Sequence, residues 1–240
     1  MTANSLPPTT EKPQFVQQLF NTIARRYDLL NDCISFGMHR FWKSQLCRSL
    51  KLQTGHHALD VCTGTGDLIR YLLPQVGPEG RVTGLDFSQE MLAVAHQRYP
   101  TAKEPRVTLV QGDAMALPFD PASFDAAVVA FGLRNVASIE TAVAELAKVV
   151  RVGGVVAIMD TIPNPRLPGF GFYFKHVMPL FGRLLAGSQQ SYQYLQASTD
   201  AFYTPAQLQQ VCADAGLHRI QVRTFGFGTV VCITAEKPFI

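Results

Sequence analysis

The sequence predicts a single α/β domain built on a seven-stranded, mostly parallel sheet whose last strand is antiparallel. Short apolar runs alternate with helical patterns between about residue 57 and residue 159, which is typical of βαβ units in a sheet covered on both faces. Two further apolar runs, separated by glycines, then indicate a closing hairpin. The length of 240 residues, 47% of them hydrophobic, is sufficient for the core of one large domain.

Composition and charge exclude several classes of protein. The net charge is +3 and no run of Lys and Arg occurs, which argues against a nucleic-acid binder. The five cysteines are scattered and form no CxxC pair, so they predict neither a disulfide framework nor a metal site and favour a reducing cytoplasm. No signal or transit pattern is found, and no apolar stretch reaches the roughly 18 residues that a membrane span needs. We therefore expect a cytoplasmic protein without a metal.

The N-terminal part is expected to be helical after an irregular start. Residues 1–14 contain three prolines and are predicted to form a disordered lead-in to the domain, which covers residues 15–240. Apolar residues recur at spacings of four from Phe15 to Ile23, and a second helical run follows at Phe41–Leu50. We expect residues 15–52 to form a helical lid.

The rest of the chain supplies the sheet and its covering helices. The strands are predicted at His57–Cys62, Arg81–Leu85, Val107–Val110, Asp125–Phe131, Val155–Met159, Ile220–Phe225 and Thr229–Ala235. The helices are predicted at Leu68–Val76, Ser88–Tyr99, Ser138–Val150 and Thr204–Gly216, with Ser88 and Thr204 as N-caps. A long insertion, residues 162–203, precedes the last helix.

A glycine-rich turn follows the first strand and predicts a ligand site. Gly64 and Gly66 stand where a strand turns sharply into a helix, a place where a Cβ would block both the turn and a ligand's approach. A phosphate-binding loop would need Gly-Lys-Ser/Thr, which is absent, and a dinucleotide site would need a small residue where Ile69 stands. The remaining option is a nucleoside ligand without phosphates.

Acidic residues end the next two strands. Asp86 lies twenty residues after Gly66, where a carboxylate can accept both ribose hydroxyls, and Asp113 is placed to accept from an adenine amino group. In this order, these residues resemble the signature of class I S-adenosylmethionine (SAM) methyltransferases, a superfamily with a Rossmann-like fold, over about residues 50–160. The cofactor-binding residues expected from this resemblance are Asp60, Thr63, Gly64, Thr65, Gly66, Asp86, Phe87, Asp113, Ala114 and Ala130.

Three further motifs carry a more specific resemblance. Residues 27–42 read YDLLNDCISFGMHRFW, residues 131–136 read FGLRNV and residues 191–195 read SYQYL. They resemble the signatures of the ubiquinone/menaquinone biosynthesis C-methyltransferase family, and the chain is most similar to its demethylmenaquinone and demethylphylloquinone branch. Departures include Leu30 for Met, Asp160 for Glu and Gln190 for Glu.

The resemblance implies methylation of a ring carbon of a quinone precursor, the final methylation of phylloquinone or menaquinone synthesis. Because an oxidised quinone ring is electron-poor, the substrate should be the reduced demethyl-naphthoquinol. Arg134 and Asn135 follow a strand's carboxyl end and are expected to be catalytic. Arg134 would hold and polarise a water or stabilise the phenolate, while Asp28, Tyr27 or His39 of the lid would relay the proton.

The insertion points to a lipid-tailed substrate. No Asp or Glu occurs between Thr161 and Thr199, whereas Arg166, Lys175 and Arg183 add positive charge among many aromatic and aliphatic residues. This composition favours a groove for an isoprenoid or phytyl tail, or transient peripheral contact with a membrane surface. A homodimer interface or plain packing of the lid is the alternative.

Other functions stay open at this stage. They are a benzoquinol C-methyltransferase of ubiquinone synthesis, a small-molecule methyltransferase outside quinone synthesis and a non-catalytic SAM-binding subunit of a quinone-synthesis complex. Loss of Asp86 or of the glycine turn would mark the last of these, and both are present.

Overall fold

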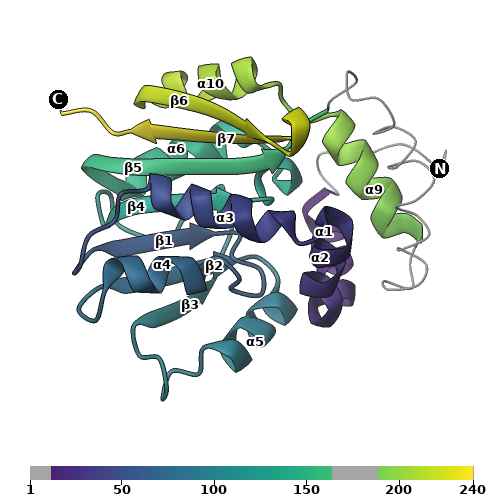
Figure 1. Ribbon diagram of the computed structural model, residues 1–240, viewed down its shortest axis with the longest axis horizontal. Helices are drawn as coiled ribbons and strands as arrows, with labels where there is room; N and C mark the ends of the chain where they lie inside the picture. Colours follow the sequence, from purple (N-terminus) through teal and green to yellow (C-terminus); the bar gives the residue numbers. More distant parts are fainter. Residues whose placement is uncertain (1–11, 164–188, 240) are drawn as a thin grey trace.

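The computed structural model describes residues 12–163 and 189–239, and it has a seven-stranded sheet at its centre (Figure 1). The strands are β1 (His57–Val61), β2 (Arg81–Asp86), β3 (Val107–Gln111), β4 (Phe124–Ala130), β5 (Val150–Thr161), β6 (His218–Phe225) and β7 (Val230–Glu236). Their order is β3-β2-β1-β4-β5-β7-β6. The first five strands pair in parallel, and β7 is antiparallel to both β5 and β6. The predicted fold is confirmed.

Helices cover both faces of the sheet (Figure 1). Those described are α1 (Lys12–Ile23), α2 (Tyr27–Ser35), α3 (Met38–Ser49), α4 (Ile69–Val76), α5 (Gln89–Arg98), α6 (Ile139–Val149), α9 (Gln189–Asp200) and α10 (Pro205–Asp214), with short 3-10 turns η1 (Ala24–Arg26), η2 (Leu133–Asn135) and η4 (Gly226–Gly228). One core cluster contains residues of α3 and α4, the other residues of α6 and α10. Alternate residues of β4 belong to the two clusters, as expected for a strand buried on both faces.

Three boundaries differ from the prediction by three residues or more. Helix α1 begins at Lys12, inside the segment 1–14 expected to be disordered, because a proline at position 13 is tolerated in a first helical turn. Helix α3 begins at Met38 rather than Phe41, directly after the left-handed Gly37. Strand β5 begins at Val150 rather than Val155, and the register of its pairing with β4 shifts near this start.

The helix caps agree with the sequence. The Ser88 hydroxyl accepts the Met91 N–H at the start of α5, and Thr204 forms a capping box with Gln207 at the start of α10. Of the insertion, helix α9 is described, whereas most of the cationic, aromatic stretch lies outside the described residues. Among the helices that the structure describes, none is long and apolar enough to cross a membrane.

The loops after β1 and β4 meet at the switch point of the sheet, where β2 and β3 lie on one side of β1, and β4 and β5 lie on the other. Cys62 and Phe131, which directly follow these strands, both have left-handed backbones, with φ of 56° and 59°. A Cβ on Gly132 would lie 2.4 Å from the Cys62 Cβ, so the two loops pack tightly. In open α/β sheets, ligands bind outside the carboxyl ends of the strands at this switch point. Helices α1 and α2 lie across this edge (Figure 1).

Candidate active site

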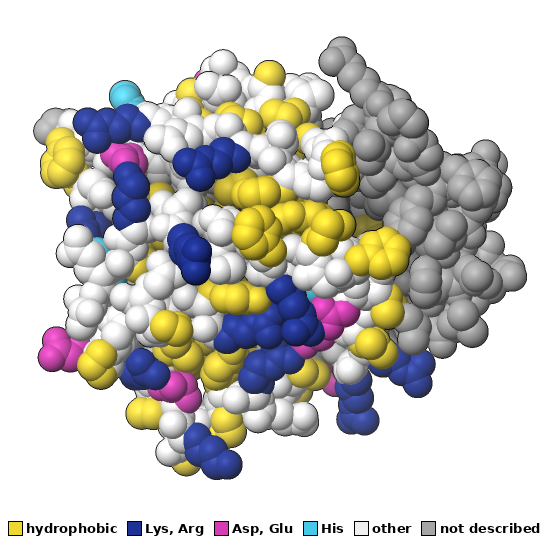
Figure 2. Space-filling view, viewed as in Figure 1, with side chains coloured by type: hydrophobic (Ala, Val, Ile, Leu, Met, Phe, Trp, Pro, Cys, Tyr) yellow, Lys and Arg dark blue, Asp and Glu magenta, His cyan; other side chains and the backbone are white. Residues whose placement is uncertain are grey.

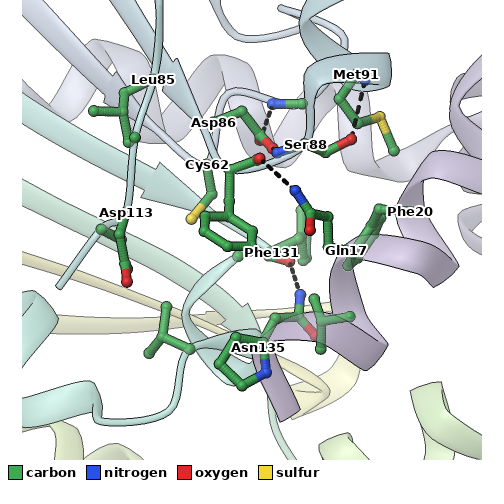
Figure 3. A pocket seen from close by; sticks show the side chains of 18 of the residues that line it. Gln17, Phe20, Cys62, Leu85, Asp86, Ser88, Met91, Asp113, Phe131 and Asn135 are labelled. Atoms are coloured by element: carbon green, nitrogen blue, oxygen red, sulfur yellow. Dashed lines mark hydrogen bonds between the residues drawn. The ribbon is translucent and has the colours of Figure 1, made fainter. Parts of the chain in front are cut away.

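A cavity opens at the carboxyl ends of β1, β2, β3 and β4, beneath α1. It encloses about 790 Å³ of empty space, part of it open to solvent. Figure 3 shows Asp86 and Ser88 on one side, Asp113 on another and Asn135 facing them, with Gln17 and Phe20 of α1 closing the space. The lining mixes backbone, carboxylate and apolar groups, as is usual for small-molecule sites.

Asp86 is held in place by backbone donors. Its Oδ2 accepts the Gly64 N–H and its Oδ1 accepts the Ser88 N–H, both at 2.8 Å. Burial raises the pKa of this carboxyl, against the opposing effect of these N–H groups. Because a carboxylate has about four lone-pair positions, these N–H groups leave acceptor capacity for a hydroxyl of a ligand. This geometry suits the predicted contact with a ribose.

The two glycines of the turn have different roles. Gly64 lines the cavity with φ of 57°, and a Cβ there would lie 3.9 Å from the Tyr27 ring. Gly66 has φ of 76° and faces away from the cavity, because a Cβ there would meet the Tyr99 ring at 3.1 Å and Ala95 at 3.4 Å. Gly64 therefore leaves room near the ligand site, whereas Gly66 allows the turn to pack on α5.

Asp60 lies beneath the turn, fully buried. Its Oδ2 accepts the Thr63 hydroxyl at 2.5 Å, while Oδ1 has no hydrogen-bond partner among the described residues. Burial raises the pKa of Asp60 to about 7. An unpartnered buried carboxylate oxygen is costly, and a cationic or N–H-bearing ligand would satisfy it.

Six of the ten residues predicted to bind the cofactor line the cavity: Gly64, Asp86, Phe87, Asp113, Ala114 and Ala130. The other four do not line it: Asp60 belongs to β1, and Thr63, Thr65 and Gly66 belong to the turn that follows. One oxygen of Asp113 accepts the Met115 N–H at 2.9 Å, which fixes the carboxylate at the cavity edge. Acceptors for ribose hydroxyls, an acidic lining and the unpartnered Asp60 oxygen fit a nucleoside with a cationic sulfonium, such as SAM.

Asp28 joins the lid to the turn instead of lining the cavity. One of its oxygens accepts the Thr65 hydroxyl at 2.7 Å and the other pairs with the Arg98 guanidinium. A second lid residue, Lys43, pairs with the buried Asp67 at 2.8 Å, just after the turn. A hydrogen bond from Thr65 thus attaches α2 to the loop that shapes the cavity, and the Lys43–Asp67 ion pair attaches α3 to it.

Arg134 is buried behind the cavity, in η2. Its Nη1 donates to Asp160 Oδ1 at 2.6 Å and to the Phe131 carbonyl at 2.8 Å. Burial, the largest single effect, acts to lower the pKa of Arg134, but the charge and hydrogen bond of Asp160 together with Tyr27 and Tyr194 outweigh it, and the net shift is upward. The Arg134 Nε–H is buried and has no partner among the described residues. This group is an unused donor from a permanently charged side chain.

Asn135 and Tyr194 bring two of the sequence motifs together. Asn135 lines the cavity, and its Oδ1 accepts the Tyr194 hydroxyl of α9 at 3.2 Å. Burial raises the pKa of Tyr194 to about 12, so its hydroxyl stays protonated and able to donate. Tyr27 also lines the cavity and shares a neighbouring hollow with Arg134, Asn135 and Tyr194.

His39 lies in an adjoining apolar groove. Its Nδ1 is 2.7 Å from the Ser35 hydroxyl, and burial, reinforced by the Lys43 charge, lowers its pKa to about 4. The imidazole is therefore neutral at pH 7. The groove holds about 1010 Å³ of empty space and extends from Phe36 and Phe227 to Phe131 and Arg134. Phe131 also lines the cofactor cavity, so the two spaces adjoin.

The sequence prediction missed the residues of α1 that cover the cavity. They are Pro13, Val16, Gln17 and Phe20, and Gln17 Nε2 donates to the Phe87 carbonyl at 3.3 Å. Lys12 anchors the start of the helix by donating to the Arg134 and Val136 carbonyls at 3.1 and 2.6 Å. The spacing of four from Phe15 indicated the helix but not which of its faces meets the cavity.

Known proteins match both the sequence and the fold. Residues 8–237 match the ubiE/COQ5 methyltransferase family. A demethylmenaquinone methyltransferase of Bacillus cereus is 40% identical over 95% of this chain and 97% of its own length. One from Staphylococcus aureus is 42% identical over 89% of each chain.

Solved structures support the fold at lower identity. A SAM-dependent methyltransferase from Aquifex aeolicus superposes with a TM-score of 0.60 at 19% identity, covering 81% of this chain and 89% of that one. A Haemonchus contortus phosphoethanolamine N-methyltransferase superposes with a TM-score of 0.60 at 18% identity. The superposition covers 78% of this chain and 50% of that one. With this fold and this cavity, the chain is a SAM-dependent methyltransferase and belongs to the ubiE/COQ5 methyltransferase family.

Proposed function

We propose that the chain methylates a ring carbon of a reduced demethyl-naphthoquinone carrying an isoprenoid or phytyl tail, as the last methylation of menaquinone or phylloquinone synthesis. The names of the Bacillus and Staphylococcus relatives support a naphthoquinone ring. The observation that carries the proposal is the unpartnered Nε–H of buried Arg134, a residue that lines the apolar groove beside the cofactor cavity.

The chemistry requires a phenolate and a group that stabilises it. A phenolic hydroxyl has a pKa of about 10, so only about one in a thousand is ionised at pH 7. Loss of this proton moves electron density onto the neighbouring ring carbon. SAM, when bound, would supply the methyl group, its S–CH3 bond breaking as the ring C–CH3 bond forms, and the proton on that ring carbon would then be lost to restore the aromatic quinol. Arg134 cannot serve as the base, because its guanidinium remains protonated. Its Nε–H instead donates to the oxygen on which negative charge develops.

The lid residues then have separate roles. Tyr27 lines the cavity beside Asn135 and is placed to bond the substrate oxygen or relay its proton. Asp28 has both oxygens occupied by Thr65 and Arg98, so it positions the lid. His39 lines the apolar groove as a neutral side chain. Its pKa of about 4 makes it too weak a base to take the proton at pH 7.

A radiolabelled methyl-transfer assay on the purified chain tests this function. A short-tailed demethyl-naphthoquinone is offered with and without a reductant, beside a matched benzoquinone. We expect label in the naphthoquinone only under reducing conditions. Label in the benzoquinone alone would place the chain in ubiquinone synthesis, and no label in either, with SAM bound, would leave a non-catalytic cofactor-binding subunit.

A further inference from the structure

One face of the molecule, formed by α3, β6 and η4, presents large apolar side chains to the outside. Those exposed are Phe36 (72%), Met38 (42%), Phe41 (59%) and Phe227 (84%). Figure 2 shows hydrophobic side chains gathered over α3 and the adjoining end of the β6–β7 hairpin. Single exposed apolar residues are ordinary, but a contiguous group marks an interaction surface. We refer to these four residues as the aromatic patch.

The patch rests on a packed support. The Phe41 ring meets the Phe225 ring edge-on at 6.4 Å, which joins α3 to the end of β6. Trp42 is buried against η4, where a Cβ on Gly226 would lie 3.0 Å from its ring. The exposed side chains are therefore held outward by an ordered layer beneath them.

Positive charge lies beside the patch on the same face. A surface hollow between α3 and the β6–β7 hairpin is lined by four cations, Arg48, Lys51, Arg219 and Arg223, and by one carboxylate, Glu236. Glu236 pairs with Arg219 at 3.0 Å and with Lys51 at 3.8 Å. Arg48 and Arg223 have no ion pair within 4.0 Å among the described residues. The hollow thus has a formal excess of three positive charges.

We propose that this face docks on an anionic lipid bilayer. Exposed aromatic side chains enter the boundary between headgroups and acyl chains, while cations beside them pair with lipid phosphates. This charge complementarity identifies the occupant, since a second copy of the chain would bring the same excess of positive charge to the contact.

The docked orientation also explains the apolar groove. Phe36, Met38 and Phe227 belong both to the patch and to the groove that leads to Arg134. A substrate tail can therefore remain near the bilayer while its ring reaches the unpartnered Nε–H. This last step rests on the proposed function, whereas lipid binding rests on the surface alone.

Co-sedimentation with vesicles tests the docking. We expect the full chain to bind vesicles containing about one-third phosphatidylglycerol, to bind pure phosphatidylcholine weakly, and to be released as salt rises from about 0.05 to about 0.5 M. Phe41→Ser and the double variant Arg48→Glu/Arg223→Glu should each lower partitioning about tenfold or more. The matched control is Arg81→Glu/Lys103→Glu, which reverses two exposed cations near the opposite edge of the sheet. In addition, Phe41→Trp should show a blue-shifted fluorescence on anionic vesicles.

Other results would overturn the docking. They are absence of partitioning, an equal loss in the control variant, or a change in sedimentation coefficient of Phe41→Ser without lipid, which would make this face an interface between copies. Methyl transfer to a short-tailed quinol without vesicles is measured on the same variants and should be unchanged. Vesicle binding by a chain that methylates no quinol would retain the docking and reject the proposed function.

Discussion

Arg134 Nη1 lies 2.6 Å from Asp160 Oδ1, so a buried ion pair joins the turn after β4 to the end of β5. Asp160 Oδ2 also accepts the backbone N–H of Arg134 at 3.1 Å. The guanidinium is thereby held by its Nη1 end, which leaves its Nε–H available for the proposed bond to the substrate. The position of this donor depends on a residue from the neighbouring strand.

Asp160→Asn should therefore destabilise the fold. Removing one partner leaves the buried Arg134 charge uncompensated, at a cost of about 3–5 kcal/mol in the free energy of unfolding, measured by urea denaturation. Lys148→Met, which removes the exposed partner of Glu145, is the control and should cost less than about 1 kcal/mol. Equal effects would mean that the Arg134 pair contributes no more than a surface contact.

Arg134→Lys should separate catalysis from cofactor binding. Lysine keeps the charge but lacks the planar guanidinium and its Nε–H. We expect kcat to fall about 10²–10³-fold, as for loss of one donor to a developing oxyanion, with SAM affinity changed less than about threefold. Steady-state kinetics measures kcat, and calorimetry measures the affinity for SAM. Similar losses in both would contradict the assigned role.

Asp86→Ala should impair SAM binding without unfolding the chain. The carboxylate is expected to accept two ribose hydroxyls, and each hydrogen bond to a charged group is worth about 1.5–3 kcal/mol. Calorimetry should show an affinity loss of about 100-fold or more. Asp214→Ala, an exposed carboxylate on α10, is the control, and unchanged affinity of Asp86→Ala would reject the ribose contact.

Asp60 should make stability depend on pH. Its carboxyl has a pKa of about 7 when folded, against about 3.9 unfolded, so the folded chain holds an extra proton between these values. The free energy of unfolding therefore falls as pH rises from about 4 to about 7, by at most about 4 kcal/mol, and then levels. The difference between the native chain and Asp60→Asn, in urea melts across this range, isolates the contribution. A constant difference would refute it.

Arg98→Met should loosen the lid. The variant loses the pair with Asp28, which is partly exposed and worth about 1 kcal/mol or less. Trypsin should then cut faster after Arg25 or Arg26, in the η1 turn between α1 and α2. Arg106→Met, which breaks an ion pair with Glu104 away from the lid, should be cut at the native rate. The same rate in both variants would remove Asp28 from its positioning role.

Local pattern in the sequence determined the order and type of the elements. Periodicity and turn residues placed all seven strands, and the caps Ser88 and Thr204 behave as predicted. Asp86 and Asp113 could be placed at one cavity because the carboxyl ends of parallel strands share an edge. These inferences need only short-range geometry and the rules of parallel sheets.

Only the tertiary structure decided which groups those residues meet. It pairs Arg134 with Asp160, commits Asp28 to Thr65 and Arg98, buries His39 beside an apolar groove and lays α1 over the cavity. Each of these contacts joins residues far apart in the chain. A hydrogen bond or a pKa shift depends on the partner and the burial that long-range packing supplies. The local sequence predicts neither the partner nor the burial.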